Sequence, residues 1–172
     1  MKIVHIPKKI LRDKTQKIKD PISKKIQDLL PRMFKIMHEA HGVGLAAPQI
    51  GLGLRIAVIE ISGKRIVLIN PRITAHSREK ILFEEGCLSI PEKIYSIVRA
   101  SRVTARYCDE DGRKCKIKAS GLFAIALQHE IDHLDGIVIA DRYKQQRKER
   151  GMFSKRELVR KTKGETVQTK KE

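Results

Sequence analysis

The chain has 172 residues, of which 41% are hydrophobic, and it carries 37 Lys or Arg against 20 Asp or Glu, which gives a formal net charge of +17. Such a chain can bury one hydrophobic core, and it has no apolar run near the roughly 20 residues that cross a bilayer. Aromatic residues are too few, at 4%, to favour stacking on nucleic-acid bases. Met1-Lys2-Ile3 opens no secretory signal, so we expect a cytoplasmic protein without membrane contact. Our default expectation for its oligomeric state is a monomer.

Residues 22–40 have the periodicity of an amphipathic helix. Pro31 interrupts this pattern and cannot donate to the carbonyl of Gln27, so the sequence predicts a kink or a break there. The apolar positions of the helix are Ile22, Ile26, Leu29, Leu30, Met33, Ile36 and Met37.

A glycine-containing segment, Gly42-Val43-Gly44-Leu45-Ala46-Ala47-Pro48-Gln49, follows this helix. Glycine permits both tight bends and close approach of another backbone, so the segment is either a turn or a surface against which an extended peptide lies. His41 precedes it and would add a titratable group beside such a surface, or lie on the surface without a role.

Five strand-like runs follow, at residues 54–60, 64–70, 94–99, 102–108 and 114–118, with turns at Ser62-Gly63 and Asp111-Gly112. The polar stretch 72–80 is predicted to be a loop. Cys108 and Cys115 flank the second turn, so we expect them to face each other across two strands. In a cytosolic chain we expect both to be free thiols.

The last apolar segment is predicted to be a buried helix, with Ser120 at its start and Gly136 at its end. Strands that precede this helix indicate an α+β fold, in which mostly antiparallel sheets pack around it.

This helix contains Gln128-His129-Glu130-Ile131-Asp132-His133, the HExxH pattern. Its two histidines lie one helical turn apart, so both can bind one divalent ion while Glu130 serves as a base. Two histidines four residues apart can also lie in a core or on a solvated surface. Buried histidines need polar partners, however, and a metal ion would provide one.

The third ligand separates the enzyme classes that share HExxH. The pattern HExxHxxGxxH fails because Gly136 is followed by Ile137-Val138-Ile139. Another class takes a glutamate from a later helix as the third ligand. The candidates here, Glu149 and Glu157, lie among Lys and Arg, which is a poor setting for a buried ligand. Cys87 is the remaining soft donor. One thiolate and two imidazoles fill three positions of a tetrahedral ion and leave the fourth for water, as in catalytic sites.

Three segments of the chain together resemble the signatures of the peptide deformylases: Gly42 to Gln49, Glu85-Gly86-Cys87-Leu88-Ser89, and Gln128 to His133. The resemblance extends to about Asp141. It implies the fold of that family and a hydrolase that removes the formyl group from formyl-methionyl nascent peptides. It also implies one divalent metal per chain, with Fe²⁺ expected and Zn²⁺, Ni²⁺ or Co²⁺ as alternatives.

The resemblance implies that Cys87, His129 and His133 bind the metal. Glu130 would be the general acid and base, and the Gln49 amide and the Leu88 backbone N–H would donate to the formyl oxygen. The peptide would lie as a strand beside residues 42–45, with its methionine in an apolar pocket to which Leu127 could also contribute. The residues expected to bind the substrate or support the loop around it are Gly42, Val43, Gly44, Glu85, Gly86, Ile90, Arg99 and Ile125.

Residues 142–172 carry twelve Lys or Arg and four Glu with few apolar residues. We divide the chain into a catalytic domain, 1–141, and this basic extension, which we expect to be helical to about residue 160, with an interruption near Gly151, and then disordered. A solubility tail is one interpretation. The resemblance favours another, in which residues 142–163 bind ribosomal RNA near the exit tunnel through phosphate contacts.

Two rival functions remain. A metallopeptidase could use the same HExxH, although the Gln49 and Cys87 segments argue against it. A nucleic-acid-binding protein with structural zinc would need a fourth ligand, and Cys108 and Cys115 belong to a separate hairpin.

Overall fold

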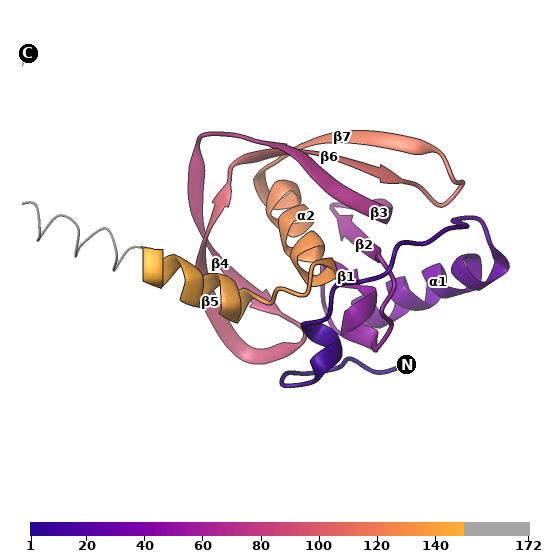
Figure 1. Cartoon of the computed structure of the whole chain (residues 1–172), viewed down its shortest axis with the longest axis horizontal. Coiled ribbons are helices and arrows are strands. Elements are labelled where there is room, and N and C mark those ends of the chain that lie inside the picture. Colours follow the sequence, from indigo (N-terminus) through magenta and orange to yellow (C-terminus); the bar gives the residue numbers. More distant parts are fainter. Residues whose placement is uncertain (150–172) are drawn as a thin grey trace, which may run out of the picture.

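The structure is a computed structural model that describes residues 1–149. As predicted, the fold is α+β. A five-stranded antiparallel sheet in the order β1-β2-β3-β6-β7 and the two-stranded sheet β4-β5 lie around helix α2 (Figure 1). Within residues 1–149, no helix is long and apolar enough to cross a membrane. The elements are a 3₁₀ turn (Lys9–Leu11), α1 (Lys24–Glu39), β1 (Gly44–Ala46), a second 3₁₀ turn (Ala47–Ile50), β2 (Ile56–Ile61), β3 (Lys64–His76), β4 (Lys80–Cys87), β5 (Ile90–Ala100), β6 (Arg102–Cys108), β7 (Lys114–Ser120) and α2 (Gly121–Leu134).

All five predicted strands are present, as β2, β3, β5, β6 and β7, whereas β1 and β4 were not predicted. The predicted loop at 72–80 is wrong, because β3 continues to His76 and β4 begins at Lys80. This part of β3 is polar because Arg72 and Thr74 face solvent, while Ile73 between them packs on the core. The sequence of this part of β3 does alternate between polar and apolar residues, as in a half-exposed strand, but over too few positions for the strand to be predicted.

The predicted juxtaposition of Cys108 and Cys115 is also wrong. Cys115 lies opposite Tyr107, and Cys108 lies opposite Lys114. Because side chains alternate along a strand, this offset of one residue places the two thiols on opposite faces of the sheet. Both cysteines are free.

Helix α1 continues through Pro31, so the predicted break does not occur. Buried residues lie on both sides of the proline, among them Ile26, Leu30 and Met33, and they pack against Val58 of β2 in one core cluster. This packing holds the two halves of the helix together despite the missing hydrogen bond, and most helical stability in proteins comes from such packing.

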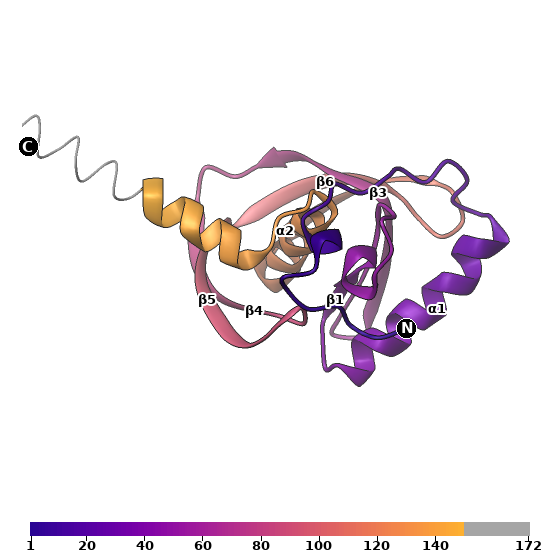
Figure 2. The same ribbon diagram turned by 60° about the horizontal axis from the view of Figure 1, so that its bottom comes forward.

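Helix α2 has the predicted limits, with Ser120 as the residue before its first turn, although the Ser120 side chain makes no capping hydrogen bond. Its last carbonyl, that of Leu134, accepts from Thr15 N (3.1 Å), Thr15 Oγ1 (2.7 Å) and Arg55 Nη1 (3.2 Å). Figure 2 shows the N-terminal segment, in indigo, passing this end of α2. The orphan carbonyl of the helix end is therefore satisfied by parts of the chain far away in sequence.

Residues 139–149 form a further helix, which extends along the β4-β5 side of the molecule (Figure 1). Residues 142–149 of the helix that was predicted to reach about residue 160 belong to it, and the remainder of that prediction lies outside the described residues. The interruption expected near Gly151 and the disorder expected at 161–172 lie outside the described residues, and the division of the chain at 141/142 stays a prediction.

We predict that Gly136→Ala destabilises the fold more than Gly63→Ala does. Both glycines have a left-handed backbone, with φ of +76° and +75°, so both variants incur about 1–2 kcal/mol of strain. A Cβ at Gly136 would also lie 2.5 Å from the Arg12 carbonyl oxygen, whereas a Cβ at Gly63 meets nothing within 4 Å. We expect an additional loss of about 1–3 kcal/mol for Gly136→Ala, measured by urea unfolding. Equal losses would contradict this packing.

Candidate active site

Three side chains of metal-ligating type, Cys87, His129 and His133, converge beside the cavity between α2 and the β4-β5 hairpin; Cys87 and His129 line this cavity, and His133 is buried next to them. Cys87 is the last residue of β4, and His129 and His133 lie one turn apart on α2. Nε2 of His133 is 3.2 Å from Cys87 Sγ and 3.2 Å from His129 Nε2. The donor atoms of all three residues lie within 4.8 Å of one another, which fits binding of a single ion.

The chemistry of these donors suits a divalent transition metal. One thiolate and two imidazoles are donors of borderline softness, and together they fill three of the four coordination positions of a tetrahedral ion. Glu130, the residue after His129 on α2, also lines this cavity. Within residues 1–149, Glu130 Oε2 is buried and has no hydrogen-bond partner. An unpaired buried oxygen beside three metal donors indicates a place for a further polar group or water.

Burial raises the pKa of Glu130 to about 7. Gly44 of β1 lies against this carboxylate, and a Cβ at position 44 would overlap Glu130 Oε1 and lie 2.8 Å from its Cδ. Glycine at this position therefore leaves the space that the Glu130 side chain occupies. Contact with the chain's own Glu130 accounts for glycine at position 44, and both interpretations of the glycine segment, a turn or a surface for an extended peptide, stay predictions.

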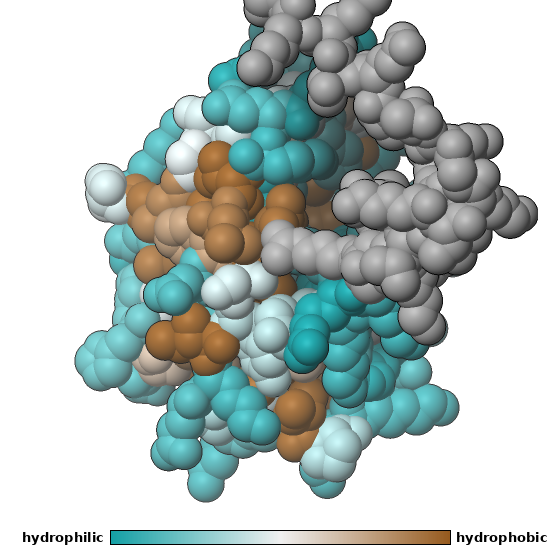
Figure 3. Space-filling view, turned by 90° about the vertical axis from the view of Figure 1, so that its left-hand side faces the viewer, coloured by the Kyte–Doolittle hydropathy of each residue, from teal (hydrophilic) through white to brown (hydrophobic). Residues whose placement is uncertain are grey.

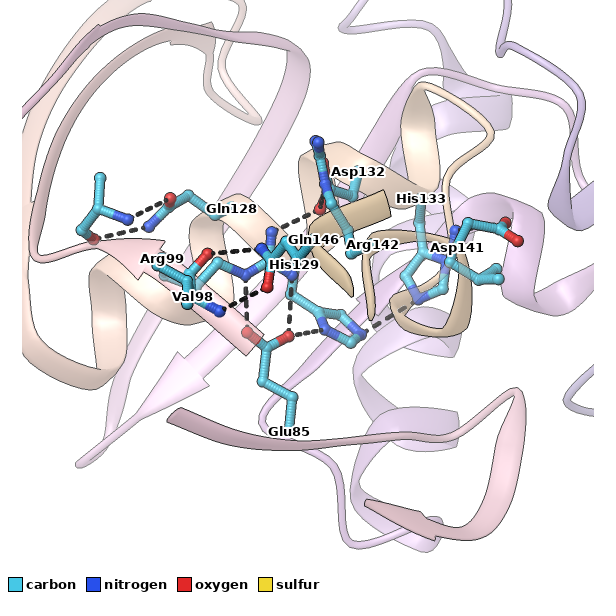
Figure 4. Close-up of polar contacts among 12 residues, drawn as sticks. Glu85, Val98, Arg99, Gln128, His129, Asp132, His133, Asp141, Arg142 and Gln146 are labelled. Carbon is cyan, nitrogen blue, oxygen red and sulfur yellow. Dashed lines mark hydrogen bonds and ion pairs between the residues drawn. The ribbon is translucent and has the colours of Figure 1, made fainter. Parts of the chain in front are cut away.

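A buried ionic network lies behind His129 (Figure 4). Arg99 Nε and Nη2 donate to the two oxygens of Glu85 at 2.6 and 2.9 Å, and Arg99 Nη1 donates to Asp132 Oδ2 at 2.5 Å. Glu85 Oε2 is also 2.9 Å from His129 Nδ1. Burial raises the pKa of Glu85, but the hydrogen bonds from Arg99 and His129 outweigh it and lower that pKa to about 2. Glu85 is thus an anion that orients the imidazole.

Gln49 lies in the second 3₁₀ turn, and its amide is oriented by the backbone. Its Oε1 accepts from Ala46 N at 2.8 Å, which leaves Nε2 directed toward Cys87 Sγ at 3.7 Å. Leu88 follows Cys87 in the turn between β4 and β5, and its side chain packs beside Gly42, where a Cβ would lie 2.8 Å from Leu88 Cδ1. Both expected donors therefore lie next to the cysteine, Gln49 in space and Leu88 along the chain.

The cavity has a volume of about 710 Å³. Its lining includes most of the predicted site residues, namely Gly42, Val43, Gly44, Gln49, Glu85, Gly86, Cys87, Leu88, Ile90, Ile125, His129 and Glu130. Arg99 does not line it, because its side chain is 5% exposed and lies behind Glu85. Leu127 is fully buried in the core between α2 and the large sheet, so its expected place in the methionine pocket is wrong.

Several residues around the cavity were missed in the sequence. Phe83, Ile94 and Leu122 line it and are partly exposed. Figure 3 shows hydrophobic side chains gathered on the side of the molecule that carries the β4-β5 hairpin. Phe83 was missed because its strand, β4, was not predicted. Ile94 and Leu122 lie in segments for which only secondary structure was predicted. His41 also lines the cavity and is exposed, with a positive φ of 54°.

Two further residues make a contact that was not predicted. Asp132 lies within the HExxH segment and had no predicted role, and Arg142 was assigned to the basic segment 142–163 that was expected to contact RNA phosphate. In the structure the guanidinium of Arg142 contacts the Asp132 carboxylate. The sequence gave no indication of this contact, because Arg142 and Asp132 lie on two helices that are separated by a loop.

Comparisons with known proteins agree with this geometry. A family model described as polypeptide deformylase matches residues 1–149. The peptide deformylase of Treponema pallidum is 42% identical over 135 residues, which cover 77% of this chain and 83% of that protein. The peptide deformylase of Thermodesulfovibrio yellowstonii is 43% identical over 147 residues, covering 83% and 88%.

Solved structures give the same result. A peptide deformylase from Synechococcus elongatus in complex with actinonin superposes with a TM-score of 0.80 at 35% identity, covering 82% of this chain and 77% of that one. The peptide deformylase of Thermotoga maritima gives a TM-score of 0.80 at 33% identity, covering 82% and 95%.

We predict that Arg99→Met costs about 3–5 kcal/mol of unfolding free energy, because it leaves the Glu85 and Asp132 carboxylates buried without their shared cation. Arg102→Met is the matched control, since Arg102 pairs with Glu79 in an exposed contact that is worth at most about 1 kcal/mol. Urea unfolding of the two variants measures the difference. A loss for Arg99→Met as small as that of the control would refute the role of the network in stability.

Proposed function

The chain belongs to the polypeptide deformylase family, and on that premise we propose a role for each residue around the cavity. It is a hydrolase that removes the N-terminal formyl group from nascent peptides. The observation that carries the assignment of roles is the convergence of Cys87, His129 and His133 beside the buried carboxylate of Glu130.

Cys87, His129 and His133 hold one divalent ion in this proposal, with Fe²⁺ as the expected metal and Zn²⁺, Ni²⁺ or Co²⁺ as alternatives. Such an ion supplies Lewis acidity, which polarises a carbonyl group and makes water a stronger acid. The thiolate of Cys87 needs reducing surroundings. Together with the other two free thiols of the chain, this requirement supports a cytoplasmic localisation.

Glu130 moves the proton of the reaction. When water adds to the formyl carbon, the Glu130 carboxylate accepts a proton from it and passes that proton to the amine nitrogen as the C–N bond breaks. The products are formate and a peptide with a free N-terminal methionine. The position of Glu130 Oε2, buried at the cavity wall without a hydrogen-bond partner among residues 1–149, supports this role because the oxygen is available for a proton.

The Nε2 group of Gln49 and the backbone N–H of Leu88 donate to the formyl oxygen as negative charge develops on it. The bond from Ala46 N to Gln49 Oε1 supports the role of Gln49, because it fixes which end of the amide faces Cys87. A fixed donor of this kind contributes roughly 3 kcal/mol to the stabilisation of a transition state.

The peptide binds as an additional strand along β1. Among the described residues, β1 pairs with β2 on one side only and stands at the edge of its sheet, next to the cavity. An edge strand offers unpaired main-chain groups to an extended peptide. The methionine side chain then enters the apolar part of the cavity, where Val43, Ile90 and Ile125 lie.

We predict that Glu130→Gln lowers kcat for a formyl-Met-Ala-Ser peptide by about 10²–10⁴-fold while the metal content is unchanged, because glutamine cannot accept the proton. Formate release and metal content are measured on the same sample, purified without oxygen. Glu39→Gln on the exposed face of α1 serves as the control and is expected to keep full activity. An active Glu130→Gln enzyme would exclude Glu130 as the proton carrier.

We also propose that the protein works as a monomer and binds ribosomal RNA through the basic residues after 141. Three of the described ones, Lys144, Arg147 and Lys148, are exposed on the helix at 139–149, and Arg147 lies over the Tyr143 ring. Arg142 faces Asp132 and is not available for phosphate. The rest of the proposed segment, to residue 163, lies outside the described residues.

For this proposal we expect the triple variant Lys144→Gln/Arg147→Gln/Lys148→Gln to bind ribosomes more weakly. Each lost phosphate contact should reduce the slope of log affinity against log salt by about 0.7–0.9. The triple variant Lys24→Gln/Lys25→Gln/Lys35→Gln removes the same charge from α1 and should keep the slope of the unchanged protein. Equal slopes in all three proteins would contradict binding through this helix.

A further inference from the structure

Asp132 contacts two cations, although the proposed reaction gives it no role. It lies between Glu130 and His133 on α2, and its side chain is 10% exposed. Arg99 from β5 reaches it from one direction, and Arg142 from the helix at 139–149 reaches it from the other (Figure 4). A buried carboxylate needs a partner, but one guanidinium would already provide it.

The second cation extends the network behind the metal-binding residues. Arg142 Nε is 2.9 Å from Asp132 Oδ2, and Arg142 Nη2 donates to Asp132 Oδ1. Asp132 Oδ2 accepts from Arg99, Arg99 donates to both oxygens of Glu85, and Glu85 Oε2 contacts His129 Nδ1. Positive and negative groups therefore alternate from the helix at 139–149 to the imidazole of His129.

The shared atoms make the contacts depend on one another. Asp132 Oδ2 is divided between Arg99 and Arg142, and Glu85 Oε2 is divided between Arg99 and His129. If Arg142 were removed, Asp132 would attract Arg99 more strongly. This attraction would weaken the hydrogen bonds of Arg99 to Glu85. In a buried site with a low dielectric constant such competition is not screened by water. Because Glu85 Oε2 contacts His129 Nδ1, a shift of Glu85 would change the orientation of the His129 ring.

The helix that carries Arg142 is also anchored without it. The side chain of Gln146 pairs with both main-chain groups of Val98 on β5, with Oε1 3.0 Å from Val98 N and Nε2 3.0 Å from Val98 O. The rings of Tyr143 and Tyr95 lie with their centroids 5.3 Å apart. Removal of the Arg142 charge therefore leaves two other contacts that hold the helix on β5, so the charge and the docking of the helix can be separated experimentally.

We propose that Arg142 is a positioning residue for deformylation, which sets the orientation of the metal ligand His129 through Asp132, Arg99 and Glu85. The first turns of the helix at 139–149 then belong to the catalytic unit, and only its later, outward-facing basic residues are available for other partners. This inference rests on the proposed role of His129 as a metal ligand.

The test compares Arg142→Gln, Arg142→Lys and Gln146→Met in the full-length protein. Co²⁺ is the probe, and its affinity is measured by competition with a chelator, together with its visible absorption bands, which report ligand geometry. For Arg142→Gln we expect roughly 10–100-fold weaker Co²⁺ binding and a shifted spectrum, as for other partners that orient a ligating histidine. Arg142→Lys keeps the charge but not the two-point contact, so it should recover part of the loss.

Gln146→Met removes the anchor to Val98 and leaves every charge in place, so we expect its Co²⁺ affinity and spectrum to match the unchanged protein. With formyl-Met-Ala-Ser, Arg142→Gln should lower kcat and keep KM, because Arg142 does not line the cavity. Unfolding curves of all variants record any loss of stability.

The proposal is overturned if Arg142→Gln keeps the Co²⁺ affinity of the unchanged protein, or if Gln146→Met weakens it equally, because Arg142 would then only hold the helix. If Arg142→Gln does not fold, Arg142→Lys decides: affinity below that of Gln146→Met supports the proposal, and equal affinity overturns it. Failure of the unchanged protein to bind Co²⁺ would instead refute the proposed metal ligands.

Discussion

The guanidinium of Arg99 is 5% exposed and lies between two carboxylates, Glu85 of β4 and Asp132 of α2. This contact joins the small sheet to the central helix, and the metal donors are distributed across the same junction, with Cys87 on β4 and the two histidines on α2. Apolar side chains alone could hold a hairpin against a helix, but they tolerate small sliding movements. The bidentate pair with Glu85 fixes the direction of the Arg99 guanidinium within the hairpin, and its remaining group, Nη1, donates to Asp132 of α2, so hairpin and helix are held at the spacing that three donors within 4.8 Å of one another require.

The sequence predicted the part of the site that depends on local geometry. HExxH determines the relation of His129 to His133 because both lie on one helix with a fixed turn. Cys87 was indicated by the exclusion of other ligands and by family resemblance, and its distance from the histidines depends on the pairing of β4 with β5. That pairing was not predictable, because β4 was not recognised as a strand. The contact of Arg142 was missed for a related reason, since the basic composition of its segment masked one inward-facing side chain.

The errors in the fold prediction have the same origin. Cys108 and Cys115 were placed opposite each other from the position of the Asp-Gly turn, but the register differs by one residue, which reverses the face of each side chain. Pro31 was expected to kink or break a helix, as its chemistry favours, but the helix continues through it because residues on both sides pack into one core cluster. Residue types indicated both long helices and five of the seven strands, whereas register and packing decided how those elements meet.

The carbonyl of Leu134 has a consequence for the order in which the molecule forms. Its hydrogen bonds to Thr15 and Arg55 close loops of more than 100 and of almost 80 residues, because 119 and 79 positions separate the partners. Contacts so distant in sequence form late in folding, since the entropy of loop closure must be overcome first. During synthesis the segment around Thr15 leaves the ribosome long before α2 exists. We therefore expect this N-terminal segment to dock last, as a latch that secures the histidine-bearing helix once the sheets have assembled.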